Sequence, residues 1–153
     1  MYNMYMHLKS EKGAALLDSI IAIAIFVVLF VGFFALMQVG VKTVTEHKAR
    51  AGALAIARSQ IEYVRSLDYV SVGLVGGSPS GNIEGTTADS LNNISYTMTT
   101  SITWYDDPED GLAGADTNPN DYKSVSVVVT WLEHAGVTSS VALSTFVSDF
   151  IVE

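Results

Sequence analysis

The stretch from residue 13 to residue 38 constrains this chain more than any other feature of its sequence. Its central eighteen residues, 20–37, contain no charged, amide or hydroxyl side chain. As an α-helix they would extend ~27 Å, close to the thickness of the hydrocarbon core of a bilayer. We therefore expect residues 14–41 to form a membrane-length helix. A single acid, Asp18, stands at its N-terminal edge, a position at which an ordinary membrane anchor does not need an acidic residue.

Residues 1–13 form a short polar leader that carries Lys9 and Lys12 against Glu11. A secretory signal peptide would continue with an apolar core of about 7–15 residues and a small-x-small cleavage site. Here the apolar run is longer and ends in Leu36-Met37-Gln38. We therefore expect the run to stay in the mature protein.

This N-terminal pattern resembles that of type IV pilin-like proteins, in which a glycine precedes F-T-L-[LIV]-E and a long apolar helix. The matching features are Lys12-Gly13, Leu16-Leu17 and the acid Asp18 at the fifth position after the glycine. The chain departs from the pattern in having Ala14 instead of an aromatic residue, and aspartate instead of glutamate. The resemblance implies that a prepilin peptidase cleaves between Gly13 and Ala14 on the cytoplasmic side and methylates the new N-terminus.

A carboxylate at the position of Asp18 needs a cationic partner, because an unpaired charge in the apolar zone costs about 3 kcal/mol. Cleavage after Gly13 would create an ammonium on Ala14, about one helical turn from Asp18. The ammonium of a neighbouring subunit is an equally good partner. In the family that the chain resembles, this acid makes the contact between subunits and sets their axial stagger. The alternative is that Asp18 lies in the headgroup layer of an uncleaved anchor.

The charges of the chain are unevenly distributed. The net charge is −8, and beyond Arg65 the only basic residue is Lys123, against twelve acids. An acidic region of this kind repels phosphate backbones, so we expect no nucleic-acid binding by it. The chain has no cysteine, which excludes disulfides and thiolate metal sites.

The basic residues on either side of the apolar run leave two topologies open. Four of them follow the run and outnumber Lys9 and Lys12 before it; they are Lys42, Lys48, Arg50 and Arg58. By the positive-inside rule alone, the C-terminal part would lie in the cytoplasm. The resemblance implies the opposite, an extracytoplasmic C-terminus, because pilin-like proteins commonly carry basic residues beyond the span.

Residues 42–68 are predicted to continue the helix in amphipathic form. Four apolar positions recur at helical spacing and need a covering surface; they are Leu54, Ala57, Ile61 and Val64. The complete helix would run from Ala14 to about Leu67. Three glycines fall within it at positions 32, 40 and 52, either as points of local melting or as sites of close packing.

Residues 69–153 are predicted to form a β-rich head, so the fold class is α+β, with a long N-terminal helix packed against a small antiparallel sheet. Residues 68–93, rich in Gly, Ser, Asn and Thr, are predicted to be a connecting loop. Alternating apolar residues predict strands over 94–105, 123–132 and 137–147, which would form a three-stranded meander.

The segment between the first two predicted strands is strongly acidic and contains no basic residue. Such a loop either stays solvated or gathers a hard cation. The candidate calcium ligands are Asp106, Asp107, Asp110, Asp116, Asn118 and Asp121. It is not an EF-hand, because Val127 stands where the twelfth-position glutamate would be. Both interpretations of the loop stay open.

Three function classes follow. The first is a minor structural subunit of a type IV pilus or a type II secretion-like pseudopilus, processed by cleavage and assembled through its hydrophobic helix. The resemblance implies other pilin-like subunits, prepilin peptidase, an inner-membrane assembly platform and, before assembly, membrane lipid as partners. The second is a bitopic protein with an uncleaved anchor and a small β-rich binding domain. An enzyme is not expected, because no nucleophile–base pairing or metal-ligand motif is present.

Overall fold

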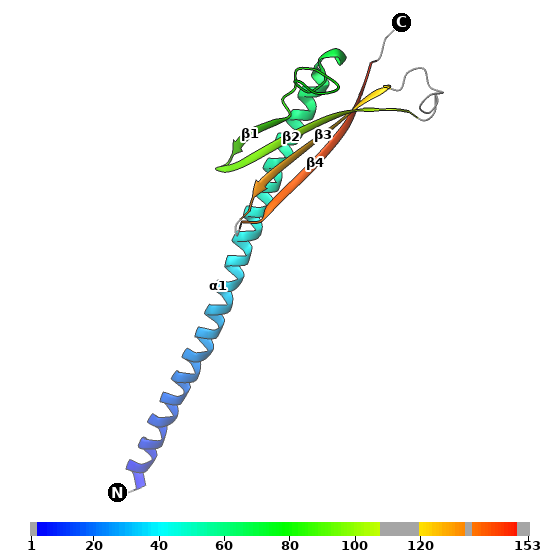
Figure 1. The fold of residues 1–153 in the computed structure, drawn as a ribbon. Helices are drawn as coiled ribbons and strands as arrows, with labels where there is room; N and C mark the ends of the chain where they lie inside the picture. Colours follow the sequence, from blue (N-terminus) through cyan, green and yellow to red (C-terminus); the bar gives the residue numbers. More distant parts are fainter. Residues whose placement is uncertain (1–2, 108–119, 134–135, 150–153) are drawn as a thin grey trace. The chain divides into compact units, whose positions relative to one another are not determined.

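The structure, a computed structural model, describes the backbone of residues 3–12 and all atoms of residues 13–107, 120–133 and 136–149. The chain divides into two compact units, Met1–Thr45 and Glu46–Glu153. Its elements are α1 (Asn3–Ser66), the short 3-10 helix η1 (Tyr69–Ser71) and four strands (Figure 1). The strands are β1 (Thr86–Leu91), β2 (Ile94–Tyr105), β3 (Tyr122–Leu132) and β4 (Thr138–Ser148).

The predicted long helix is confirmed, and α1 begins earlier than expected. It starts at Asn3, so it includes most of the residues assigned to the leader, and it ends at Ser66. The first proline of the chain is Pro79, so nothing within α1 removes a backbone donor. The helix is assigned without a break through Gly32, Gly40 and Gly52.

The head contains one antiparallel sheet in the order β1-β2-β3-β4, so the prediction of three strands was wrong by one. The missing strand is β1, which lies inside the segment predicted to be a loop. It pairs with β2 from Thr86↔Thr99 to Leu91↔Ile94. Asn92 and Asn93 join the two strands with φ of 54° and 62°, the left-handed conformation that a two-residue hairpin turn requires.

One face of the sheet carries the core, and the predicted alternation in β3 is confirmed there. Val125, Val127 and Val129 are fully buried, and Trp131 is nearly so. On the neighbouring strands Tyr96 and Ile102 are buried, and Val141, Leu143 and Val147 pack partly against them. Val137, predicted to begin the last strand, precedes β4 and is exposed.

The C-terminal part of α1, within the second unit, packs on this face of the sheet. Its most buried residues are small, with Ala53 and Ala57 completely covered. Gly52 lies under Tyr96, whose hydroxyl donates to the carbonyl of Ala49 at 3.0 Å. Small side chains therefore allow the helix backbone to approach the sheet closely.

The predicted apolar stripe of this helix segment is confirmed in its main positions. Ala57 and Val64 are buried, Ile61 packs against the core, and Leu54 is half-buried. The stripe also includes Ile56, which the predicted set did not contain. The predicted fold class, α+β with a long helix on an antiparallel sheet, is confirmed.

Candidate functional site

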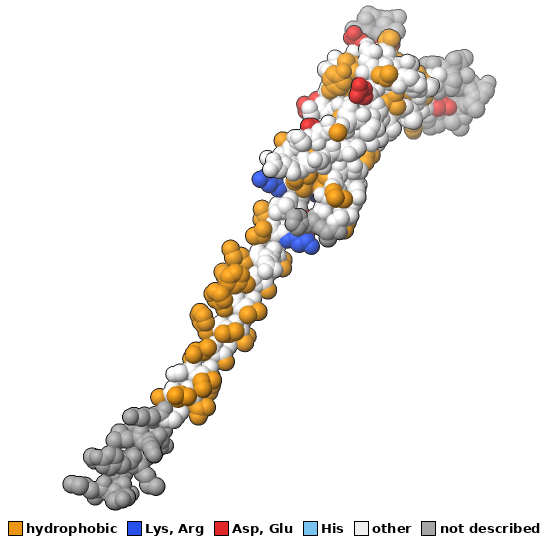
Figure 2. All heavy atoms as spheres, turned by 60° about the vertical axis from the view of Figure 1, so that its left-hand side comes forward, with side chains coloured by type: hydrophobic (Ala, Val, Ile, Leu, Met, Phe, Trp, Pro, Cys, Tyr) orange, Lys and Arg blue, Asp and Glu red, His pale blue; other side chains and the backbone are white. Residues whose placement is uncertain are grey.

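The apolar part of α1 is the most unusual surface of the molecule. Every residue from 13 to 48 is exposed, and large apolar side chains such as Leu29 and Leu36 expose 67% and 73% of their area. Figure 2 shows hydrophobic side chains along the described length of this segment. By length and composition, one helix, Gly13–Ser66, is able to cross a membrane. Its exposed apolar area requires lipid or other helices as cover.

The hydroxyl groups of this segment are satisfied by the helix itself. Ser19 donates to the carbonyl of Ala15 at 2.9 Å, and Thr43 and Thr45 each donate to the carbonyl four residues earlier at 3.0 Å. Such bonds remove the need for water at these positions. The hydroxyl groups of Ser19, Thr43 and Thr45 are therefore compatible with an apolar environment.

Aromatic side chains form a ladder along this part of α1. Phe26 and Phe30 have ring centroids 5.7 Å apart, and Phe30 and Phe34 have centroids 4.9 Å apart. The four-residue spacing places the three rings on one side of the helix. They form a ridge against which lipid chains or another helix can pack.

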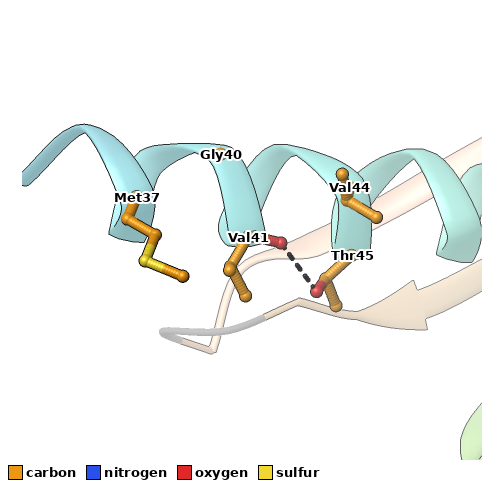
Figure 3. A pocket seen from close by; sticks show the side chains of 5 residues that line it. All are labelled: Met37, Gly40, Val41, Val44 and Thr45. Atoms are coloured by element: carbon orange, nitrogen blue, oxygen red, sulfur yellow. Dashed lines mark hydrogen bonds between the residues drawn. The ribbon is translucent and has the colours of Figure 1, made fainter. Parts of the chain in front are cut away.

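The helix surface also carries a shallow hollow of about 400 Å³ beyond the ladder (Figure 3). It is lined by Met37, Gly40, Val41, Val44 and Thr45. Thr45 directs its hydroxyl to the carbonyl of Val41, as the figure shows. None of the described residues that line the hollow is titratable, so these residues offer apolar contact.

The predicted processing residues lie in a regular and accessible part of α1. Gly13, Ala14 and Asp18 are all helical and exposed. Asp18 lies four residues after Ala14, which corresponds to ~6 Å along the helix axis. In the uncleaved chain the nitrogen of Ala14 is an uncharged amide, so only cleavage would supply a cation there.

The structure brings together the two ends of the predicted acidic loop. The backbone N–H of Asp107 donates to Asp121 Oδ2 at 2.7 Å, and the hydroxyl of Tyr122 donates to Asp107 Oδ2 at 3.3 Å. Asp106 Oδ1 is buried and has no hydrogen-bond partner among the described residues. Asp110, Asp116 and Asn118 lie outside the described residues.

The calcium assignment therefore stays a prediction. Within residues 13–107, 120–133 and 136–149, no group of three or more His, Cys, Asp or Glu side chains is placed to hold a metal ion. The two ends of the loop nevertheless hold Asp107 and Asp121 in contact, as a loop closed by a cation would require.

Sequence reasoning missed one polar site, the buried side chain of Lys123 on β3. Its ammonium donates to the carbonyls of Tyr69 at 2.6 Å and Val72 at 2.7 Å. It also lies 4.1 Å from the ring centroid of Tyr69 and 5.2 Å from that of Trp104. Lys123 is only 3% exposed. Its position in the sequence could have indicated this site, since Lys123 lies two residues before Val125 and therefore faces the same side of β3.

The surroundings of Lys123 shift two pKa values. Burial lowers the pKa of Lys123, and the nearby Asp149 carboxylate partly opposes that effect. Burial also raises the pKa of Tyr69, helped by the negative charges of Asp149 and Asp121. Because the ammonium is held by backbone carbonyls and aromatic rings, it fastens η1 to the sheet and does not face a substrate cavity.

Comparison with known proteins found no matching family model, no matching curated protein and no matching solved structure.

Proposed function

We propose that this protein is a minor structural subunit of a type IV pilus or of a type II secretion-like pseudopilus. The observation that carries the proposal is the apolar segment of α1, whose residues are exposed from 13 to 48 while the following turns pack under a sheet. One helix thus presents a lipid-compatible surface and also belongs to the core of a folded head.

In this proposal the precursor is a single-pass protein of the inner (cytoplasmic) membrane with an extracytoplasmic C-terminus. Prepilin peptidase cleaves after Gly13 and methylates Ala14, and an inner-membrane platform assembles the mature chain with other pilin-like subunits. The apolar surface then exchanges lipid for neighbouring helices. The new ammonium of one copy pairs with Asp18 of another, which offsets the cost of a carboxylate in an apolar filament core.

The N-terminus of the mature protein provides the direct test. The chain is expressed with a prepilin peptidase, purified from membranes and examined by mass spectrometry. We expect an N-methylated alanine, residue 14, as the first residue. An intact leader in cells with active peptidase overturns the proposal.

Substitution of Asp18 tests the assembly step. We expect Asp18→Asn to abolish filaments, because it keeps the shape of the side chain and removes its charge. Asp18→Glu, which keeps the charge, should retain them. Ser19→Ala is the matched control, since the Ser19 hydroxyl donates to the carbonyl of Ala15 in its own helix. Electron microscopy measures the yield, and wild-type filaments from Asp18→Asn would contradict this role.

The second candidate is a bitopic protein with an uncleaved anchor and a small β-rich binding domain. It is favoured by the charge balance around the span, because the basic residues that follow outnumber those that precede it. Mass spectrometry separates the two candidates, since only this one retains Lys9 and Lys12 in the mature chain.

A further inference from the structure

The two edges of the head sheet are β1 and β4. β4 is the longer, with eleven residues that pair with β3 without interruption from Leu132↔Thr138 to Tyr122↔Ser148. It contains no charged residue and no proline. Native proteins usually blunt an exposed edge with charges, prolines or bulges, because its free backbone groups pair readily with another strand. The free edge of β4 lacks these devices.

The direction of the strands decides which edge of a second copy fits. Neighbouring strands are antiparallel throughout the sheet, so β1 and β4 run in opposite directions. Two copies side by side in the same orientation therefore bring β4 of one against β1 of the other as an antiparallel pair. Copies anchored in one membrane share their orientation. We infer that β4 of one head pairs with β1 of a second copy of this chain.

The pattern of side chains selects one register for this pair. On the face that carries the core, β1 presents Asp89 and Leu91, and β4 presents Leu143 and Thr145. Pairing Leu91 with Leu143 puts Asp89 opposite Thr145. A shift of two residues in either direction keeps the faces but puts the carboxylate opposite Leu143 or Val147. A shift of one residue reverses the faces.

Charge complementarity supports the same register. Arg65 donates through Nη2 to Thr145 Oγ1 at 2.9 Å, which places a guanidinium beside β4. Asp89 is exposed on β1, where its Oδ1 accepts a hydrogen bond from the backbone N–H of Ser90 at 2.7 Å. In the inferred pair, the carboxylate of one copy approaches the guanidinium and hydroxyl of the next. On the opposite face, Ala88 leaves room for Phe146, which is 61% exposed.

The contact is heterologous, because two different edges meet. A heterologous contact leaves a free β4 and a free β1 at the two ends, so it continues as a ring or a helical array. The inference rests on the proposed function for the shared orientation of the copies. It adds a specific contact between heads to the contact between helices.

Cysteine cross-linking of the full chain in membranes tests this pair, since the protein has no native cysteine. In the inferred register Ser90 lies opposite Ser144 on the outer face. We expect the double variant Ser90→Cys/Ser144→Cys to form a ladder of oligomers on oxidation. The matched control is Ser90→Cys/Ser140→Cys, which moves one thiol by ~13 Å along the same strand. Thr86→Cys/Ser148→Cys probes the same register independently if the first variant folds poorly.

Charge reversal supplies a second measurement on the cross-linking background. Asp89→Arg and Arg65→Glu should each lower the yield by about fivefold, and the two together should restore it. Glu84→Arg makes the same charge change at an exposed position before β1, and should leave the yield unchanged. Equal yields from Ser90/Ser144 and Ser90/Ser140, or no recovery in the double reversal, overturn the inferred pair.

The outcomes separate this inference from the proposed function. Filaments that show no Ser90–Ser144 cross-link overturn the strand pairing and leave the function in place. A cross-linked ladder from a chain that keeps its leader and forms no filament supports the pairing and overturns the function.

Discussion

At the scale of single residues, Lys123 shows how a buried cation can serve the fold. The ammonium contacts two backbone carbonyls near η1. The carbonyl of Tyr69 also accepts from the backbone N–H of Val72 at 3.2 Å, whereas the buried carbonyl of Val72 would cost about 1–3 kcal/mol if left without a donor. The ammonium satisfies both, and the rings of Tyr69 and Trp104 lie near its charge. The side chain thus joins residues 69–72 to β3.

We expect Lys123→Met to destabilise the head by about 1–3 kcal/mol, because it keeps the apolar stem, leaves the buried carbonyl of Val72 without the ammonium donor, and leaves the carbonyl of Tyr69 with only its backbone bond from Val72. Thermal unfolding followed by circular dichroism measures the effect. Lys48→Met is the control, since Lys48 is an exposed lysine on α1. A loss no greater than that of the control would show that the carbonyl of Val72 finds another donor.

The pH dependence of stability gives a second measure of Lys123. Because its pKa is lowered in the folded state, the unfolded chain binds more protons in the window between that pKa and the ordinary value of 10.5. The contribution of Lys123 to stability therefore rises with pH through this window. We expect the free energy of unfolding of the wild type to rise relative to that of Lys123→Met as the pH approaches 10.5. A constant difference would contradict the lowered pKa.

At the scale of elements, α1 uses two kinds of surface in succession. Its apolar segment exposes large side chains, whereas its C-terminal turns bury alanine and glycine under the sheet. At Gly52 a β-carbon would lie 2.5 Å from the hydroxyl oxygen of Tyr96, but at Gly32 it would meet nothing within 4 Å. Of the two roles considered for the glycines, close packing thus applies at Gly52.

We expect Gly52→Ala to destabilise the head by about 1–3 kcal/mol, although alanine favours a helix by about 1 kcal/mol. The added methyl group must displace Tyr96 and weaken its hydrogen bond to Ala49. Gly32→Ala is the matched control and should not lower the melting temperature. An unchanged melting temperature for Gly52→Ala would mean that Tyr96 can move aside without a loss of stability.

The loop between β2 and β3 provides a second prediction at this scale. If it binds calcium, millimolar calcium should raise the melting temperature of the full chain in detergent relative to chelator, because a ligand of the folded state stabilises it. Asp121→Asn should reduce that shift, whereas Asp89→Asn, on the exposed edge strand β1, should not. No shift with calcium would leave the solvated-loop interpretation.

At the scale of the whole molecule, the two units have different requirements for stability. Among the described residues, the buried core begins at Ala49 and includes residues from α1, β2 and β3, with partly buried residues of β4 packed against it, so it lies within Glu46–Glu153. The unit Met1–Thr45 contributes none of these buried residues. The head can therefore be stable without the apolar segment of α1.

We expect a chain shortened to residues 46–153 to be soluble without detergent and to unfold cooperatively, because it keeps every residue of the core cluster. The full chain should require detergent or lipid, since its helix exposes apolar residues such as Phe26 and Leu36. Circular dichroism and sedimentation measure both properties. An unfolded short chain would show that the head depends on the preceding helix.

By itself, the sequence determined the features that depend on local composition. The membrane-length run, the amphipathic turns and the three strands with apolar alternation could be predicted, because each pattern reports which side chains must leave water. The positions of Ala14 and Asp18 within one helix followed in the same way, whereas Gly13, assigned to the leader, also proved to be helical.

Only the tertiary structure decided the features that join distant parts of the chain. β1 has few apolar side chains and is held by backbone pairing to β2, which no side-chain pattern reveals. Lys123 meets a carbonyl 54 residues away, and Arg65 meets a hydroxyl 80 residues away. Such contacts depend on how helix and strands pack, because a polar group becomes costly, and so needs a partner, only once packing has removed its water.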